Sequence, residues 1–259
     1  MQRSQNTRYD LVNTTAITSN FMHFRNPWIV AWWSLAFPGF GHFLVNSFIW
    51  GFILMSFEYL INTLTNLNTS IFYSMLGRFE EAKQVLNLRW FFLYIVVYIF
   101  AVWDSYRRAV DLNKVYQLAY SQFKSINPLH LSAMDINLLE KKSPLIAMIW
   151  SFLMPSLGWI YLQRIWSFLF HLVWWMVILY NSRLLEGIFY TMIGEFDQAT
   201  HLLEPQWVLY LPSIYGFVLY STYSFAVENN RLFELSQSRF LQNRYQLGSL
   251  DRMFIGKEN

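Results

Sequence analysis

The chain contains no cysteine among its 259 residues. This absence excludes disulfide bonds, a thiolate nucleophile and any metal site with cysteine ligands. It leaves the compartment open, because a chain without cysteine suits a reducing or an oxidising one. Glycine and proline are also sparse, with 10 and 7 residues, and they form neither a glycine-rich nucleotide loop nor a nucleophile elbow. No metal-ligand pair occurs at a useful spacing either. We therefore expect no cofactor, no metal and no enzyme activity.

Charged residues are scarce as well. They make up 14% of the chain, against about 25% in soluble domains, whereas 55% of the residues are hydrophobic and 20% aromatic. All 19 lysines and arginines lie outside the long apolar stretches, and among the 16 acids only Glu58 lies deep within one, with Asp104 near the end of another. A soluble helical protein would place charges along one face of each helix. Because apolar stretches of about 20 residues match a bilayer core, we expect an integral membrane protein whose main partner is the lipid bilayer. The net charge of +3 is too small to indicate nucleic-acid binding.

The chain contains an internal repeat. A shift of 117 residues aligns 27–119 with 144–236 without a gap, and 24 of the 93 aligned positions are identical. The matches include Pro27, Trp33, Ser34, Pro38, Gly41, Gly77, Trp90 and Asn113, aligned with Pro144, Trp150, Ser151, Pro155, Gly158, Gly194, Trp207 and Asn230. The pattern predicts a tandem duplication. It divides the chain into a polar N-terminal tail (1–26), a first membrane repeat (27–119), a linker (120–143), a second membrane repeat (144–236) and a polar C-terminal tail (237–259).

Each repeat has four parts. The first is a short apolar segment interrupted by Pro38 or Pro155, since proline removes a helical hydrogen bond and clashes with the preceding turn. An apolar run (48–65, 165–182), a mixed segment (66–89, 183–206) and an aromatic-rich run (90–106, 207–227) follow. The mixed segment spaces its apolar residues as one helical face, which predicts an amphipathic helix at the membrane surface. We expect an all-α, polytopic helical membrane protein with two tandem homologous repeats. Each repeat would hold a Pro-Gly-broken apolar segment, two further transmembrane helices and one interfacial amphipathic helix.

The start of each repeat carries a short motif. The first copy reads Arg25-Asn26-Pro27, then Ser34, then Pro38-Gly39-Phe40-Gly41-His42-Phe43. This run resembles the NP…LS…PGxGxxY start of TM2-like bacterial membrane domains, in which a second helix with an early glycine follows. The second copy has Ser156 for the first glycine and Phe168 at the place of Gly51, and the first copy has Leu44 at the place of Tyr161. The resemblance implies a paired-helix module, duplicated in tandem, in a bacterial plasma membrane. It implies no catalytic residues.

The basic residues distinguish two topologies. If the segments around Pro38 and Pro155 span the membrane, the chain crosses six times and exports the basic region 107–143. If they enter and return on one side, the chain crosses four times, and 15 of the 19 basic residues lie inside with both tails. The positive-inside rule favours four crossings. Six crossings stay open, because TM2-like modules cross with both helices and because non-helical backbone at membrane depth must be buried in protein or face water.

Glu58, His171 and His42 form the candidate intramembrane polar site. An acid at the bilayer centre costs about 2.5–3.5 kcal/mol on insertion scales, and such residues often mark ion or proton paths. His171 lies one helical turn from the position aligned with Glu58, and histidine can titrate near neutral pH. One hypothesis is a Glu58–His171 pair across the repeat interface. The other is that each side chain only forms a hydrogen bond between packed helices. A structural break motif lies beside them: Pro38, Gly39, Gly41, Pro155 and Gly158.

The sequence favours one class of function and leaves two others open. Many aromatic residues and few intramembrane polar groups favour a non-enzymatic membrane interaction or assembly module that binds other membrane proteins or itself. The alternative is a small transporter or channel with a path at the repeat interface near Glu58 and His171, because helices broken at matching positions in two halves are typical of transporters. An enzyme that acts on lipid is the remaining class.

Overall fold

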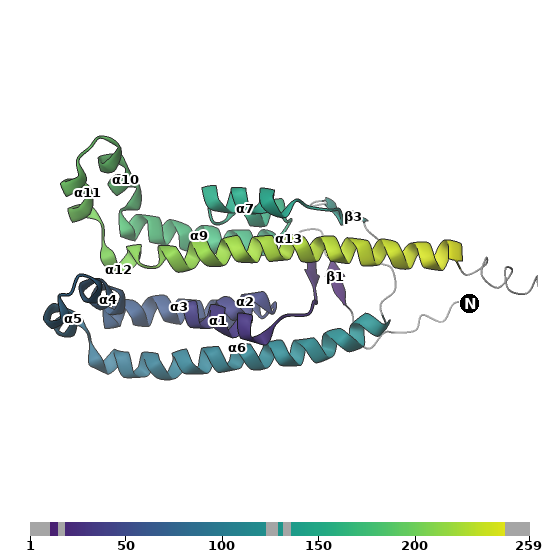
Figure 1. The fold of residues 1–259 in the computed structure, drawn as a ribbon, viewed down its shortest axis with the longest axis horizontal. Helices are drawn as coiled ribbons and strands as arrows, with labels where there is room; N and C mark the ends of the chain where they lie inside the picture. Colours follow the sequence, from purple (N-terminus) through teal and green to yellow (C-terminus); the bar gives the residue numbers. More distant parts are fainter. Residues whose placement is uncertain (1–10, 15–18, 123–128, 132–135, 247–259) are drawn as a thin grey trace, which may run out of the picture.

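The fold is all-α, as predicted. A computed structural model describes residues 11–14, 19–122, 129–131 and 136–246 (Figure 1). Six helices occupy the first repeat: α1 (Pro27–Ala36), α2 (Phe40–Leu44), α3 (Phe48–Thr65), α4 (Leu67–Met75), α5 (Phe79–Val85) and α6 (Leu88–Gln122). Seven occupy the second: α7 (Pro144–Leu153), α8 (Leu157–Tyr161), α9 (Ile165–Ser182), α10 (Leu184–Met192), α11 (Phe196–Leu202), α12 (Pro205–Val208) and α13 (Leu211–Leu241), which runs into a π-helical turn (Gln242–Gln246).

Five consecutive helices recur at a constant offset. Helices α7 to α11 begin and end 117 residues after α1 to α5. Left-handed residues recur at the same offset, with Asn66 and Arg183 both at a φ of 54°. The last helix differs, because α6 is continuous over 35 residues whereas the second repeat has α12 and α13 in its place. Pro205 and Pro212 each stand in the first turn of one of those two helices, where a missing N–H costs least.

Two antiparallel hairpins precede the repeats. Strands β1 (Val12–Thr14) and β2 (Ser19–Phe21) pair within the N-terminal tail. Strands β3 (Leu129–Leu131) and β4 (Ile136–Leu138) pair within the linker. Each strand of the second hairpin begins 117 residues after its counterpart in the first. The polar composition of the tail and linker gave no sign of these hairpins.

The helix is interrupted at both prolines. Asn26 caps α1 by accepting a hydrogen bond from the backbone N–H of Trp28, and α1 ends at Ala36. Helix α2 begins only after Pro38 and Gly39. Gly39 has a φ of 101°, a left-handed conformation that favours glycine. Ser156 takes its place with a φ of −94°, so the second break forms without a glycine there.

Gly41 and Gly158 allow each broken helix to fold back on itself. A side chain on Gly41 would collide with the carbonyl oxygen of Val30 and the hydroxyl of Ser34. A side chain on Gly158 would collide in the same way with the hydroxyl of Ser151. The serine–glycine pairs that the repeat preserves are therefore points of close helix contact.

The prediction of one amphipathic helix in the mixed segment is wrong in detail. The segment forms two short helices, α4 and α5, and the second repeat likewise forms α10 and α11. Gly77 separates the first pair with a φ of 75°, and Gly194 separates the second with a φ of 87°, so a continuous helix cannot pass through either position. The hydroxyl of Ser70 donates to the carbonyl of Ala82 at 2.9 Å and holds α4 against α5.

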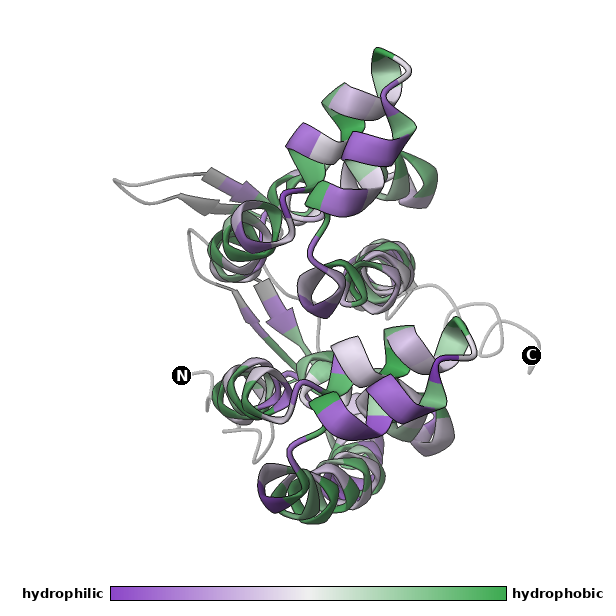
Figure 2. Cartoon of the chain, turned by 90° about the vertical axis from the view of Figure 1, so that its left-hand side faces the viewer, coloured by the Kyte–Doolittle hydropathy of each residue, from purple (hydrophilic) through white to green (hydrophobic). Residues whose placement is uncertain are grey.

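Among the residues that the structure describes, three helices are long and apolar enough to cross a membrane: α3, α9 and α6 over Leu88–Ser121. Only 17% of the most apolar 18-residue stretch of α6 is buried, so most of its apolar side chains face outward. Figure 2 views the molecule from the end that carries α4, α5, α10 and α11, and these short helices mix hydrophilic and hydrophobic residues.

The two repeats share an aromatic core. Helix α13 lies between α9 of its own repeat and helices α1 to α3 of the first, whereas α6 lies outermost (Figure 1). Phe40 stacks on Phe217 with ring centroids 4.0 Å apart, and Tyr59 stacks on Trp174 at 4.1 Å. The core therefore lies between the repeats as well as within them.

Candidate functional site

Glu58 lies in a buried hydrogen-bond network. Its side chain is 3% exposed. Oε1 accepts a hydrogen bond from Nδ2 of Asn62 at 2.9 Å and another from the hydroxyl of Tyr94 at 3.1 Å. Oε2 is buried without a hydrogen-bond partner in the described part of the chain. The carboxylate thus joins α3 to α6 within the first repeat.

The network continues into the second repeat through Gln206. Nε2 of Gln206 donates to Oδ1 of Asn62 at 2.8 Å, and the hydroxyl and backbone N–H of Thr69 each donate to Oε1 of Gln206 at 3.0 Å. Nδ2 of Asn68 donates to the backbone carbonyl of Gln206 at 2.9 Å. One glutamine therefore holds α12 against α3 and α4.

His171 lies apart from this network. Its Nδ1 is 2.7 Å from the carbonyl oxygen of Ser167, one turn earlier in α9. Its ring packs between aromatic side chains, at 5.4 Å from both Trp159 and Phe170. The structure does not bring His171 into hydrogen-bond contact with Glu58, so the hypothesis of a direct pair between them is wrong. A cavity of about 10 Å³ at the repeat interface is lined by His171 and Tyr59 among others, which is room for one water molecule at most.

His42 lies in a third place, buried beside α6. Its Nε2 is 3.1 Å from Oδ2 of Asp104. Asp104 also binds Arg107 and Arg108, each at 2.5 Å, and Nη1 of Arg108 donates to the hydroxyl of Ser47 at 3.0 Å. This ion cluster fixes the chain after the first break to the middle of α6. The three predicted site residues therefore belong to three separate groups.

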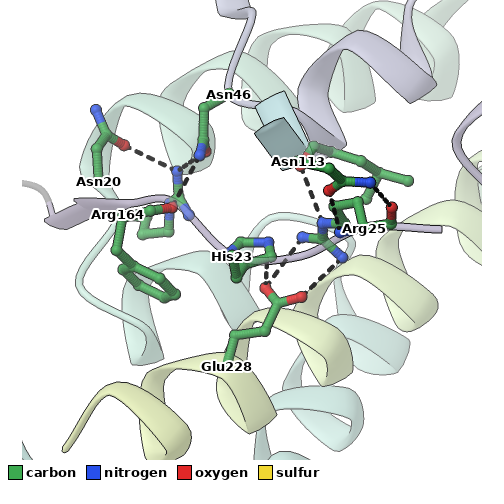
Figure 3. Close-up of polar contacts among 9 residues, drawn as sticks. Asn20, His23, Arg25, Asn46, Asn113, Arg164 and Glu228 are labelled. Carbon is green, nitrogen blue, oxygen red and sulfur yellow. Dashed lines mark hydrogen bonds and ion pairs between the residues drawn. The ribbon is translucent and has the colours of Figure 1, made fainter. Parts of the chain in front are cut away.

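Sequence reasoning missed a basic cluster where the hairpin β1–β2, α13 and the start of α9 meet (Figure 3). Arg25 forms a two-pronged ion pair with Glu228, at 2.9 Å and 3.0 Å, and its Nε donates to the carbonyl of Leu44 at 3.1 Å. Nε2 of His23 lies 2.8 Å from the same carboxylate. Burial, reinforced by the charge of Arg25, lowers the pKa of His23 below its usual value.

Arg164 is the second cation of the basic cluster and is 3% exposed. Its Nη2 donates to the amide oxygens of Asn20 at 3.0 Å and Asn46 at 3.3 Å. Its guanidinium lies 4.2 Å from the ring centre of Phe225, and Arg25 lies 5.1 Å from the same ring, so Phe225 contacts both cations. Burial lowers the pKa of Arg164 to about 10. The sequence contained no local signal for this cluster, because Arg25 and Glu228 are 203 positions apart.

One part of the cluster did leave a signal in the repeat. Asn113 exchanges two hydrogen bonds with the backbone of Arg25, and the aligned Asn230 does the same with Lys142. The alignment marked both asparagines as matched polar residues, but it did not indicate their partners.

Each of these groups connects helices or turns to one another. Among the described residues, no set of three or more histidine, aspartate or glutamate side chains could hold a metal ion. Three carboxylates accept hydrogen bonds from donors on other helices or turns: Glu58, Asp104 and Glu228. Their hydrogen bonds connect separate segments of the chain. Comparisons with protein-family models, curated proteins and solved structures find no match to the chain. The resemblance to TM2-like domains therefore stays a prediction.

Proposed function

We propose that the chain is an integral membrane protein, formed by tandem duplication, that crosses the bilayer four times. The crossings are α3, α6, α9 and α13. Three of these helices are long and apolar enough to span, and α13 follows α9 as α6 follows α3. The constant offset of 117 residues between α1–α5 and α7–α11 supports the duplication.

Helix lengths support four crossings over six. Helices α1 and α7 have 10 residues each, or about 15 Å, which is half of a bilayer core of about 30 Å. Helix α6 has 35 residues, so its length of about 52 Å exceeds that core. Its C-terminal part, from Arg107 onward, extends into the aqueous phase in this arrangement, on the side that holds the tails.

The proposed function is that of a non-enzymatic assembly module in a bacterial plasma membrane. The observation that carries it is the use of intramembrane polar groups: Glu58 binds Asn62 and Tyr94, and the network reaches Gln206 of the other repeat. These groups join helices, while the outer surface presents large apolar side chains. On α6 these include Phe92, Val96, Ile99 and Trp103, all exposed.

Transport is the second candidate, because Oε2 of Glu58 has no hydrogen-bond partner in the described part of the chain and both repeats contain a broken helix. The cavity beside His171 and Tyr59 is too small for a hydrated ion, at about 10 Å³. A transport path near these residues would therefore require the repeats to separate along the interface that Gln206 and the stacked aromatic rings hold closed.

Purification in mild detergent from native membranes, followed by mass spectrometry of co-purifying proteins, tests the assembly function. We expect stoichiometric recovery of a membrane protein or of further copies of the chain. Recovery of a monomer alone, together with ion or solute flux in proteoliposomes that Glu58→Gln abolishes, would favour transport instead.

A further inference from the structure

The two repeats contact each other through different surfaces. Face A is the surface of the first repeat that contacts the second; it comprises Trp33, Phe40, Tyr59, Asn62 and Thr69. Face B is the surface of the second repeat that meets it; it comprises Trp174, Gln206, Trp207, Tyr210, Phe217 and Tyr220. Trp33 lies 5.5 Å from Phe217 and 5.1 Å from Tyr220 between ring centres. A contact between two unlike surfaces of similar units is heterologous, so it leaves one copy of each surface uncovered.

The uncovered copy of face B lies on the first repeat. The positions aligned with Trp207, Tyr210, Phe217 and Tyr220 carry large apolar residues in α6. They are Trp90, Leu93, Phe100 and Trp103, and all four are exposed, Trp103 at 57%. Figure 1 shows why: α13 has helices on both sides, whereas α6 has α1 and α3 on one side only.

The uncovered copy of face A lies on the second repeat. Trp150 aligns with Trp33 and is 45% exposed, and Met176 aligns with Tyr59 and is 53% exposed. A hollow of about 1020 Å³ opens here, lined by Met176, Leu185 and Glu186 among others. At the aligned place on the first repeat, Gln206 and Trp207 of α12 contact Thr69 and Tyr59. The start of α6 aligns with α12, so in a second molecule it is the segment that would insert into this hollow.

We infer that the uncovered face A of one molecule binds the uncovered face B of a second copy of this chain. The inference rests on the proposed membrane assembly function and names its partner. Apolar exposure alone would fit contact with lipid. Two observations favour a protein partner over lipid. The hollow has room for a helical segment, and the pair Thr69–Gln206 is replaced at the aligned positions by the opposite charges of Glu186 and Arg89. These opposite charges would meet when the start of α6 enters the hollow.

The same geometry fixes the form of the assembly. The two repeats have the same order of elements, and their matching helices run in the same direction (Figure 1). Successive molecules would therefore associate head to tail, all with the same orientation across the membrane. Such an assembly closes into a ring if the rotation between units allows it and otherwise forms an open row. It cannot be a symmetric dimer through one shared surface.

Cysteine crosslinking tests this directly, because the chain has no cysteine of its own. Phe100 and Leu157 align with Phe217 and Phe40, whose rings are 4.0 Å apart. The double variant Phe100→Cys/Leu157→Cys, in native membranes with a short bis-maleimide, should give a ladder of dimers and larger species. Each single variant alone should give none, and the two single variants expressed together should give dimers only. The double variant Phe79→Cys/Leu145→Cys is the matched control and should give none, because these exposed residues align with Phe196 and Trp28, which stay exposed.

A charge reversal provides a second readout on the same crosslink. Arg89→Glu in the crosslinking background should lower the crosslinked fraction about fivefold, since an attraction becomes a repulsion. Adding Glu186→Arg to the same chain should restore it, because the swapped charges again meet between molecules. Both residues are exposed, so neither change endangers the fold.

Other outcomes would overturn the inference. A dimer from either single variant alone would mean a symmetric contact. Absence of a ladder in the double variant, with phospholipid retained by a monomer in native mass spectrometry, would mean that lipid covers both faces. A crosslink from Phe100→Cys to a different membrane protein would also refute self-association but would leave the assembly function standing. A failure to crosslink to any protein would refute this contact, and the co-purification experiment decides separately whether the assembly function stands.

Discussion

The side chain of Asn113 forms two hydrogen bonds with the backbone of Arg25: its Oδ1 accepts from the N–H at 2.9 Å, and its Nδ2 donates to the carbonyl at 2.7 Å. The side chain thereby fixes the chain entering α1 to the polar half of α6. Asn230 repeats the contact with Lys142, at 2.7 Å and 2.8 Å. Asparagine is the smallest side chain that can both accept and donate in this way.

Asn113→Ala should therefore destabilise the protein by about 1–3 kcal/mol, because it leaves two buried backbone groups of Arg25 without a partner. Asn113→Asp keeps the acceptor but places a carboxyl oxygen against the carbonyl of Arg25 in place of the donor, so it should cost at least as much as alanine. Asn230→Ala should cost less than Asn113→Ala, since the contact it makes is only partly buried. Thermal unfolding in detergent measures all three. Equal stability of Asn113→Ala and the parent chain would contradict this role.

The basic cluster should make stability depend on pH. In the folded protein, burial lowers the pKa of His23 below its usual value of 6.5. The unfolded chain therefore binds a proton more readily, and stability should fall as the pH drops below about 6.5. The charged groups that face His23 are Arg25, Arg164 and Glu228. His23→Gln should remove part of this fall. The measurement is the unfolding temperature of both chains at pH 7.5, 6.5 and 5.5. Parallel curves would show that His23 does not titrate in this way.

Glu58 separates the assembly and transport hypotheses. Glu58→Gln retains an oxygen that can accept from Asn62 and Tyr94, so on the assembly hypothesis the variant should reach normal abundance and assemble normally. Glu58→Leu removes the acceptor for both donors and should reduce abundance, with a cost of about 1–3 kcal/mol. Immunoblots of membranes and the co-purification yield measure the two effects. Loss of function in Glu58→Gln at normal abundance would instead support ion or proton transport.

The sequence predicted the parts of the fold that depend on local chemistry. Apolar runs predicted the long helices α3, α6 and α9, since a bilayer imposes length and composition on each span separately. The spacing of apolar residues in 66–89 fits one helical face and predicts a single helix, but Gly77 adopts a positive φ and divides the segment. The spacing of apolar residues shows which side of a helix is apolar. It does not show a turn between two short helices whose apolar sides face the same way.

The site was less accessible to sequence reasoning. Glu58, His171 and His42 were found because polar residues are rare in apolar runs, yet their partners come from other helices. The pair Arg25–Glu228 joins residues 203 positions apart outside those runs, where a charged residue attracts no notice. Only packing of the two repeats brings these side chains together, and the packing depends on which faces of α3, α9 and α13 meet.

Thiol labelling in intact cells tests the four-crossing membrane arrangement most directly. Single cysteines replace Ser121 at the end of α6 and Ser238 near the end of α13, with Glu80→Cys in α5 as the counterpart on the opposite side. With four crossings, an impermeant maleimide should label Glu80→Cys and should label Ser121→Cys and Ser238→Cys only after the cells are permeabilised. Labelling of Ser121→Cys but not Ser238→Cys in intact cells would contradict this arrangement and establish six crossings.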